Sequence, residues 1–507
     1  MKIYFSAFLI IFLAYGCGGG RKLMKKADKA FALGEYYKAY EMYERLSEKE
    51  GGSKQLQAEL AFKSARCSDL LNDSKKAESR YVRAIRKKYD DPSVYLLCAN
   101  QMLKNENYEE ALEYFTIAKQ KTPEDKRVDS GLKSLELCAL WKDSVTRYKV
   151  ENIKAVNGRG NDFAPAYAWD DFGTVFFTTT RGEDDKEQKL DDVSGMPLTN
   201  MYEVRIDRQG EWSKPTFIED TTINVNFDKG ASSFSADYKT MYFTVCKQEP
   251  AKKLGCQIVS SQRRGTEWAA PVNLRLVDDS ISIGHPSLSA DGLEMYFASR
   301  MSGGLGGADI WCSRRISPTS TWGRPINAGS AINTPGDELY PFIREDGNLY
   351  FSSDYPVGFG GLDIFRAIKD EFGTFHVSNM LPPINSPQDD FGIVFQGHRE
   401  RGLFSSTRKV GKGGDDVYSF ILPDLEFFVQ GKIQDKNSDK GIAGAKVTVY
   451  GSDGSVQDAE TRPDGSYRIP LQQYTDYIVV GAAEHYLRKK TKISTDRKST
   501  RLNSSHT

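Results

Sequence analysis

The chain has 507 residues, which at roughly 100 to 200 residues per domain predicts about three domains and excludes one compact core. Lys and Arg together number 69, as do Asp and Glu, so no excess of one sign indicates nucleic acid as a partner. Beyond the first 17 residues no apolar run reaches the roughly 20 residues that a membrane-spanning helix needs. Aromatic residues at 12% with 44 Gly predict mostly short strands and tight turns.

The first residues have the pattern of an export signal. Met1-Lys2 precedes an apolar stretch over residues 3–15 that is too short for a stable transmembrane span. The segment Leu13-Ala14-Tyr15-Gly16-Cys17 resembles the lipobox of bacterial lipoproteins, whose cysteine is acylated and becomes the N-terminus. This resemblance implies a signal peptide over 1–17 and acylation at Cys17, with acyl chains that hold the protein to a membrane. An ordinary signal peptide with a coincidental cysteine is the alternative.

The other cysteines give no metal or disulfide pattern. They are Cys67, Cys98, Cys138, Cys246, Cys256 and Cys312. None stands in a Cys-x-x-Cys pair and there are five His, so we predict no metal site and no cofactor. For Cys246 and Cys256, a bridge across a hairpin and two free buried thiols both stay open.

A helical repeat is predicted over about residues 22–145. Small and aromatic residues recur four apart as Ala39 and Tyr43, Ala77 and Tyr81, and Ala111 and Phe115. This spacing in a period near 34 resembles the tetratricopeptide repeat, a helix-turn-helix unit whose small residues allow close helix packing. Residues 127–145 are predicted to form a closing helix, and Cys67, Cys98 and Cys138 fall on apolar helix faces, which favours core packing. Such arrays usually bind a partner along their concave face, with a rigid spacer as the alternative.

A second repeat, of about 54 residues, is predicted over residues 150–422. Its most constant feature is an aromatic strand with a Ser/Thr-rich exit: Phe176–Thr179, Tyr242–Thr244, Tyr296–Ser299, Tyr350–Ser353 and Leu403–Ser406. Three of these are followed by Gly-Gly-x-Asp, and Trp-x-x-Pro at Trp212, Trp268 and Trp322 opens a further strand. The pattern resembles WD40-like propeller repeats of the TolB type. Five blades are countable. A sixth, built from residues 148–156 and 425–429, is the alternative.

No catalytic constellation is found in this repeat. The Gly-Gly-x-Asp carboxylates Asp309, Asp363 and Asp416 lie one per blade, which favours structural turns over a calcium cage. His285, His376 and His398 are scattered, and no Gly-x-Ser-x-Gly elbow occurs. We therefore predict a binding platform and no enzyme.

The last segments differ from both repeats. Residues 427–495 alternate as strands with Asp-Gly and Gly-Ala turns and resemble the carboxypeptidase regulatory-like domain, a non-catalytic seven-strand-type β-sandwich. Residues 496–507 match a reading frame of a sequencing adapter and are interpreted as a cloning scar, so we expect the natural protein to continue.

This order of modules resembles the OmpA-family lipoproteins of bacteria with type IX secretion and gliding. The resemblance implies an outer-membrane lipoprotein that faces the periplasm and binds protein partners of a secretion or gliding complex through its tetratricopeptide and propeller faces. It implies a peptidoglycan link through an OmpA-like domain that this chain lacks. A surface-exposed lipoprotein that binds glycans or peptides is the alternative.

Overall fold

The computed structural model divides the chain into two compact units, residues 1–422 and 423–507. It describes residues 20–48, 53–141, 145–181, 190–218, 223–224, 227–246, 255–265, 267–355 and 357–495. The predicted signal peptide with Cys17 and the predicted scar over 496–507 lie outside these residues. No helix in the described ranges is long and apolar enough to cross a membrane.

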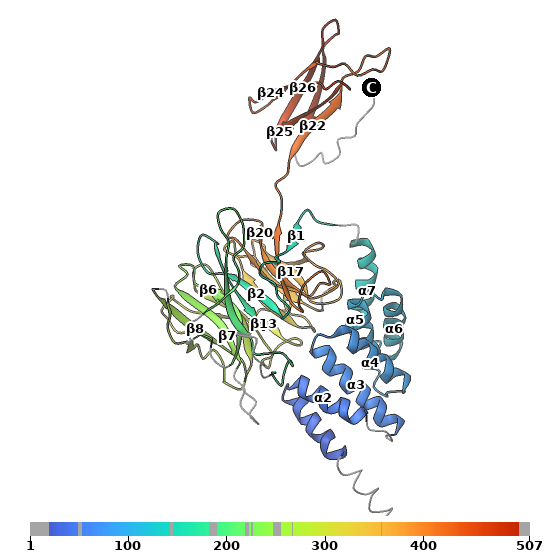
Figure 1. Ribbon diagram of the computed structural model, residues 1–507, viewed down its shortest axis with the longest axis vertical. Coiled ribbons are helices and arrows are strands. Elements are labelled where there is room, and N and C mark those ends of the chain that lie inside the picture. The colour runs from blue at the N-terminus through green and yellow to red at the C-terminus, as the bar shows by residue number, and fades with distance from the viewer. Residues whose placement is uncertain are drawn as a thin grey trace, which may run out of the picture. The chain divides into compact units, whose positions relative to one another are not determined.

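The first unit begins with an array of helices, as predicted. A helix over residues 20–32 is followed by α2 (Tyr36–Ser47), α3 (Lys54–Leu70), α4 (Ser74–Arg86), α5 (Ser93–Lys104), α6 (Tyr108–Lys121) and α7 (Lys126–Trp141) (Figure 1). Two of the helices start at side-chain caps, because Ser53 accepts from the Leu56 amide and Asp73 from the Lys76 amide.

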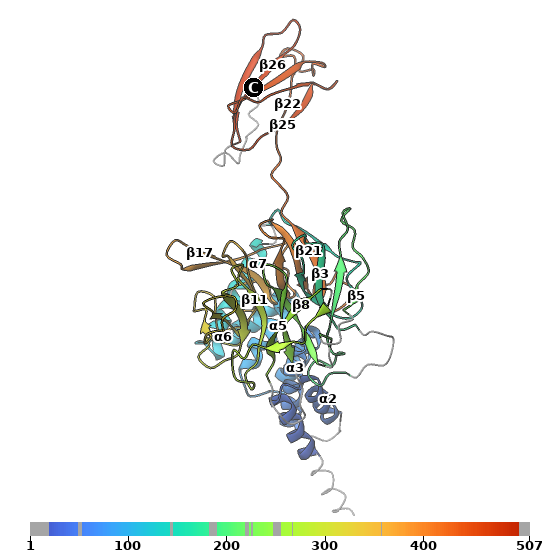
Figure 2. The same cartoon turned by 90° about the vertical axis from the view of Figure 1, so that its left-hand side faces the viewer.

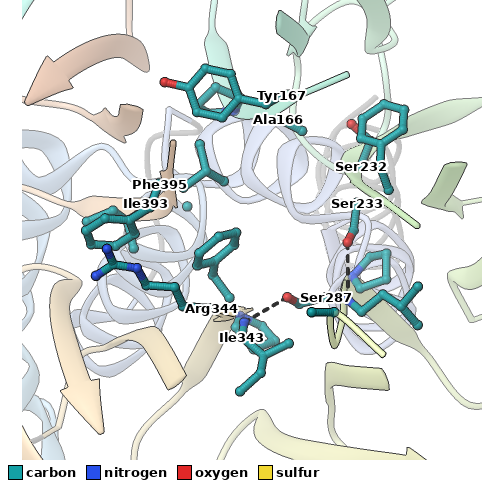
Figure 3. A pocket seen from close by; sticks show the side chains of 18 of the residues that line it. Ala166, Tyr167, Ser232, Ser233, Ser287, Ile343, Arg344, Ile393 and Phe395 are labelled. Carbon is teal, nitrogen blue, oxygen red and sulfur yellow. Dashed lines mark hydrogen bonds between the residues drawn. The ribbon is translucent and has the colours of Figure 1, made fainter. Parts of the chain in front are cut away.

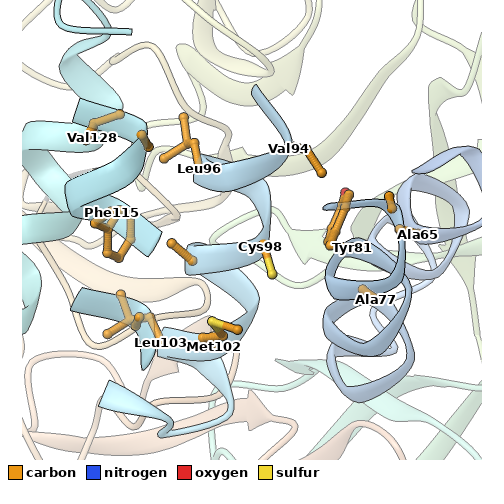
Figure 4. Close-up of a cluster of buried hydrophobic side chains, with 14 of the residues drawn as sticks. Ala65, Ala77, Tyr81, Val94, Leu96, Cys98, Met102, Leu103, Phe115 and Val128 are labelled. Carbon is orange, nitrogen blue, oxygen red and sulfur yellow. The ribbon is translucent and has the colours of Figure 1, made fainter. Parts of the chain in front are cut away.

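The repeated small and aromatic residues form the core of the array. All six members of the three pairs are at most 1% exposed. Tyr81 and Phe115 lie in one apolar cluster with residues of α5 such as Cys98 and Met102 (Figure 4). Alanine at the paired positions lets neighbouring helices approach, and the aromatic ring then fills the space between them. Cys67, Cys98 and Cys138 are buried free thiols.

Five antiparallel sheets follow the helices (Figures 1 and 2). The first contains β2 (Asp162–Tyr167), β3 (Thr174–Thr179), β4 (Asn200–Arg205) and β5 (Thr216–Phe217). The second contains β6 (Asp228–Phe234), β7 (Thr240–Cys246), β8 (Gln257–Arg264) and β10 (Val272–Asn273), with β9 (Glu267–Trp268) also on β8. The third contains β11 (Ile283–Leu288), β12 (Glu294–Ser299), β13 (Asp309–Arg314) and β14 (Ile326–Asn327). The fourth contains β15 (Glu338–Ile343), β16 (Leu349–Ser353), β17 (Asp363–Lys369) and β18 (Phe375–Asn379).

The fifth sheet joins the two ends of the β region. It contains β19 (Asp390–Phe395), β20 (Arg401–Ser406), β21 (Asp416–Ile421) and, as its outer strand, β1 (Lys149–Asn152), which pairs with β21. The first strands contact one another in chain order, from β2 through β6, β11 and β15 to β19, and β19 also contacts β2.

The structure bears on the alternative of a sixth blade and on where the outer strands begin. The segment around residues 148–156 supplies the fourth strand of the fifth sheet, and Phe427–Lys432 pairs within the second unit, so neither builds a sixth sheet. The outer strands β5, β10 and β14 are two residues long and start directly after the proline of Trp-x-x-Pro, not at its Trp. Proline has no amide hydrogen to give to a ladder, so the pairing begins after it.

Cys246 and Cys256 are joined by a disulfide.

The helices are fastened to the sheets by a buried ion pair. Lys104 Nζ at the end of α5 lies 2.7 Å from Asp389 Oδ1, and the two side chains are 13% and 8% exposed. Asp389 also accepts from the Leu362 amide and the Asn72 side chain. Burial by itself raises the pKa of Asp389, but Lys104 and these donors outweigh it and hold that pKa below its usual value.

A loop of the fourth sheet completes this contact. Between β16 and β17, Phe359 is 5% exposed and belongs to the apolar core of the helices. On α7, the Ser130 hydroxyl donates to the Tyr355 carbonyl at 2.6 Å, and Ser134 accepts from the Gly358 amide at 3.2 Å. The equivalent residue of the third sheet, Leu305, is 49% exposed. One loop of the repeat therefore carries the anchor that its counterpart lacks.

The second unit consists of two small sheets. One contains β22 (Phe427–Lys432) and β25 (Ser466–Leu471), and the other contains β23 (Lys446–Gly451), β24 (Val456–Glu460), β26 (Asp476–Ala482) and β27 (Lys489–Ser494). Residues of both sheets share one core, which includes Val447, Ile469 and Tyr477. Six strands are described, one fewer than the seven-strand type implies.

We expect Lys104→Ala to destabilise the first unit by about 3 to 5 kcal/mol, because it leaves the Asp389 carboxylate buried without its cation. The measurement is urea unfolding at pH 7. Lys119→Ala is the matched control, since its pair with Asp129 is 38% and 57% exposed and should contribute less than about 1 kcal/mol. Equal, small losses for both variants would show that the buried pair does not fasten the helices.

Candidate functional site

A cavity of about 350 Å³ lies among the first strands of the five sheets (Figure 3). Every first strand contributes side chains, including Tyr167 of β2, Ser233 of β6, Ser287 of β11, Ile343 of β15 and Phe395 of β19. The turns that follow these strands also line it. The site is therefore built by the repeat as a whole.

The same backbone irregularity shapes each first strand at the cavity. The pairing with the second strand shifts in register by a bulge in all five sheets. The bulge places one residue in the left-handed region, with φ between 49° and 64°: Ala164, Ala231, His285, Tyr340 and Gly392. Four of these five residues are not glycine, although this conformation favours glycine, so the surrounding contacts must hold it.

Hydrogen bonds between neighbouring sheets hold the bulges. The amide of Ala231 donates to Thr178 Oγ1, and that of His285 donates to Thr244 Oγ1. The amide of Ala164 donates to Ser405 Oγ, which links the first sheet to the fifth. Each acceptor stands at the same position of a second strand, in the Ser/Thr-rich exit that marks the repeat.

The third sheet departs from this rule. Ala298 stands where the other sheets have a hydroxyl, and the imidazole Nδ1 of His285 accepts the Tyr340 amide instead, at 3.3 Å. The His285 and Tyr340 rings stack with centroids 3.8 Å apart. Burial lowers the pKa of His285 to about 4, so the imidazole is neutral at pH 7 and able to accept. His285 thus has a structural task at the wall of the cavity.

Two serines and an arginine of the wall are also engaged in hydrogen bonds. Ser233 Oγ accepts from the Leu288 amide, and Ser287 Oγ accepts from the Ile343 amide (Figure 3). Arg344 is 5% exposed, lies over the Phe395 ring and gives its hydrogen bonds to two backbone carbonyls and to Glu400 Oε1 at 2.6 Å. Its charge is therefore already balanced by Glu400.

Carboxylates lie at the turns that border the cavity. Asp170 and Glu345 are both exposed lining residues, and Tyr238 lies in the same wall. Burial raises the pKa of Tyr238 first, and the charges of Glu345, Asp170 and Asp171 raise it further. Glu345 forms an exposed contact with His398, 2.9 Å away.

The cavity border and the helices lie at opposite ends of the strands. Asp389, which holds Lys104, directly precedes β19, whereas Gly397, which lines the cavity, is the second residue after it. Further contacts to the helices, at residues 192–193, 355–362 and 409, lie in the loops between a second and a third strand, at the same end of the sheets. The helices therefore leave the border of the cavity uncovered.

Of the residues singled out in the sequence, His285 lies in the cavity wall and His398 contacts Glu345 at its border, whereas the three Gly-Gly-x-Asp carboxylates and His376 are not among the lining residues. Asp309, Asp363 and Asp416 each accept from a backbone amide of the glycine loop before them, as expected of structural turns. His376 pairs with Asp370 on the surface, away from His285. Among the described residues no cluster of His, Cys, Asp or Glu could hold a metal ion.

Sequence reasoning missed the cavity because it aligned the repeats on their second strands. A signal was present in the first strands, where Ala164, His285 and Tyr340 each precede a proline. Proline cannot donate to the ladder, so within a strand it indicates a bulge or an edge. Aligning these three dipeptides would have indicated the bulges of the first, third and fourth sheets.

Comparisons with known proteins give a distant likeness of structure only. No protein-family model and no curated protein matches the chain. A thermostable family-43 glycoside hydrolase is 13% identical, covers 55% of this chain and 94% of its own, and has a TM-score of 0.36. The endo-arabinase from Bacteroides thetaiotaomicron VPI-5482 is 14% identical over 52% of this chain and 94% of its own, with a TM-score of 0.34. A prolyl endopeptidase is 12% identical over 74% of this chain and 52% of its own, with a TM-score of 0.28.

We expect His285→Ala to cost about 1 to 3 kcal/mol, because the Tyr340 amide loses its acceptor. Alanine itself fits the backbone here, since Ala164 and Ala231 occupy the equivalent left-handed positions. Adding Ala298→Ser restores the hydroxyl that the other sheets have, and the double variant should regain about 1 kcal/mol in urea unfolding. A double variant no more stable than His285→Ala would contradict this assignment.

His285 should also make stability depend on pH. Because its pKa in the folded chain is lowered to about 4, the unfolded chain binds a proton between about pH 6.5 and 4 that the folded chain does not. The free energy of unfolding should therefore fall as the pH drops through this window. His285→Ala lacks this pH dependence, so the difference in free energy of unfolding between wild type and variant should shrink towards pH 4. A difference that stays constant with pH would contradict this role of His285.

Proposed function

We propose that this chain is a non-enzymatic scaffold that binds protein partners. In this proposal the five sheets are the blades of a closed five-bladed propeller, and the helices are a tetratricopeptide array fixed to one face of it. The observation that carries the proposal is a buried helix–sheet contact through Lys104 and Asp389 together with a cavity, at the other end of the same strands, that the described helices do not cover. A fixed contact on one side and an open concave surface on the other suit a docking platform.

The chemistry of the cavity supports binding more than catalysis. A catalytic acid or base must be free to exchange a proton with a substrate. His285 already accepts the Tyr340 amide, Arg344 is bound to Glu400, and Ser233 and Ser287 accept backbone amides. These four groups are committed to holding the walls together, and the carboxylates that remain among the lining residues, Asp170 and Glu345, are exposed at the border.

The cellular setting is proposed from the resemblance described above. We propose that the protein is anchored to the outer membrane through Cys17, faces the periplasm, and serves a secretion or gliding complex. The peptidoglycan link stays a prediction of that resemblance. The second candidate, a surface lipoprotein that binds glycans, is favoured by the aromatic lining of the cavity, which includes Phe172, Phe234 and Tyr238.

Anchoring is tested by replacing the predicted lipid-bearing residue. Wild-type protein should incorporate a labelled fatty acid and fractionate with the outer membrane, whereas Cys17→Ser should do neither. Protease treatment of intact cells then distinguishes the two settings: protection supports the periplasmic scaffold, and digestion supports the surface binder. Retention of Cys17→Ser in the membrane would contradict a lipid anchor at this residue.

The docking face is tested by site-specific photo-crosslinking in cells. A photoreactive residue in place of Ala290, an exposed residue of the cavity border, should crosslink to a discrete protein partner. Val272, 65% exposed on the outer strand β10, is the control position and should give no such product. Crosslinking at Val272 but not at Ala290 would place the partner elsewhere and contradict the proposal.

A further inference from the structure

We propose that the cavity accepts the side chain of a lysine or arginine presented by a protein partner. This inference rests on the proposed docking function, and it adds the chemistry that selects the partner.

The charges at the cavity are the first argument. Three of its lining residues carry a formal charge: Asp170, Arg344 and Glu345. Arg344 is balanced by Glu400 at 2.6 Å, so Asp170 and Glu345 are the lining carboxylates that remain at the border, and among the described residues Glu345 has only an exposed contact with the His398 ring at 2.9 Å. His285 adds no positive charge, because its Nδ1 accepts a hydrogen bond. An incoming cation therefore meets two carboxylates, whereas an anion would meet no uncommitted cation among the lining residues.

The walls are the second argument. Phe172, Phe234, Tyr238 and Phe342 line the cavity and are only half-buried, so their rings are available for contact. Lysine and arginine carry a long apolar stem with the charge at its end, and aromatic walls pack against the stem while their faces attract the cation. A small inorganic cation would use none of this surface.

The surroundings of the border indicate that the side chain belongs to a protein. Trp169, the neighbour of Asp170, is 44% exposed and stacks on Arg263 at 3.8 Å. Trp169 therefore extends the aromatic surface beyond the cavity, and a free amine bound inside the cavity would not contact it. A protein chain that inserts one basic side chain into the cavity would also cover the Trp169 ring.

The test uses the purified chain and two fluorescent peptides. One peptide is seven residues long with a single central lysine, and its twin carries norleucine there, which keeps the apolar stem and removes the charge. Fluorescence anisotropy at low salt should show the lysine peptide binding about 10-fold more tightly. Asp170→Asn and Glu345→Gln should each weaken the lysine peptide about 3- to 10-fold, and the double variant should bind both peptides equally. Glu371→Gln, the same charge change at an exposed residue outside the cavity lining, should leave binding unchanged.

Equal binding of the two peptides to wild type, or a lysine preference that survives in the double variant, would overturn the inference. Tight binding of a neutral oligosaccharide with no binding of either peptide would also overturn it and support the glycan alternative. The crosslinking experiment separates this failure from that of the proposed function. A partner captured at Ala290 without a lysine preference leaves the docking face standing, and no capture at Ala290 removes both.

Discussion

The left-handed residue in each first strand is the constraint on which the sheet region depends. A residue with positive φ outside glycine is strained, and its amide points out of its own sheet. In the first three sheets a Ser or Thr hydroxyl of the preceding sheet accepts that amide, and in the fourth His285 does so. The interaction satisfies a backbone donor, joins one sheet to the next and fixes the surface that lines the cavity. The same hydrogen bond thus contributes to stability, to the order of the sheets and to the site.

The contact between helices and sheets depends on one loop and one ion pair, not on a hydrogen bond that recurs from sheet to sheet. The fourth sheet uses the general glycine loop of the repeat, but its Phe359 enters the helical core, whereas Leu305 in the third sheet stays exposed. Lys104 and Asp389 then add a charge pair that is expensive to break because both groups are largely buried. The glycine loops of the repeat are nearly equivalent, but the loop of the fourth sheet differs because its Phe359 packs in the helical core. This contact holds the helices at the strand ends opposite the cavity border.

The sequence predicted the parts of this structure that depend on local pattern. Ala39 with Tyr43 and its two counterparts lie in helix cores, and the aromatic strands with Ser/Thr exits are the second strands of five sheets. The fifth sheet's outer strand could not be derived, because β1 and β21 are about 270 residues apart and no local signal pairs them. The cavity was missed for a related reason: the left-handed residues are of different types, and only three of the five precede a proline that indicates an interrupted ladder. Asn333 and Asn385 were also overlooked, although both follow a buried Ile. Each side-chain amide accepts from the backbone amide of a third-strand isoleucine and donates to the carbonyl of the same residue.

The central claim is that partners dock at the cavity border while the contact between helices and sheets stays closed. Hydrogen exchange, measured on the chain alone and in its complex isolated from membranes, tests this most directly. The account predicts that amides of α7 and of residues 357–362 are already protected in the isolated chain and do not change. New protection should appear in the turns after the first strands, around Asp170, Tyr238 and Glu345. Partner-dependent changes confined to α7 and residues 357–362 would instead show that the contact opens to admit the partner, and would contradict the account.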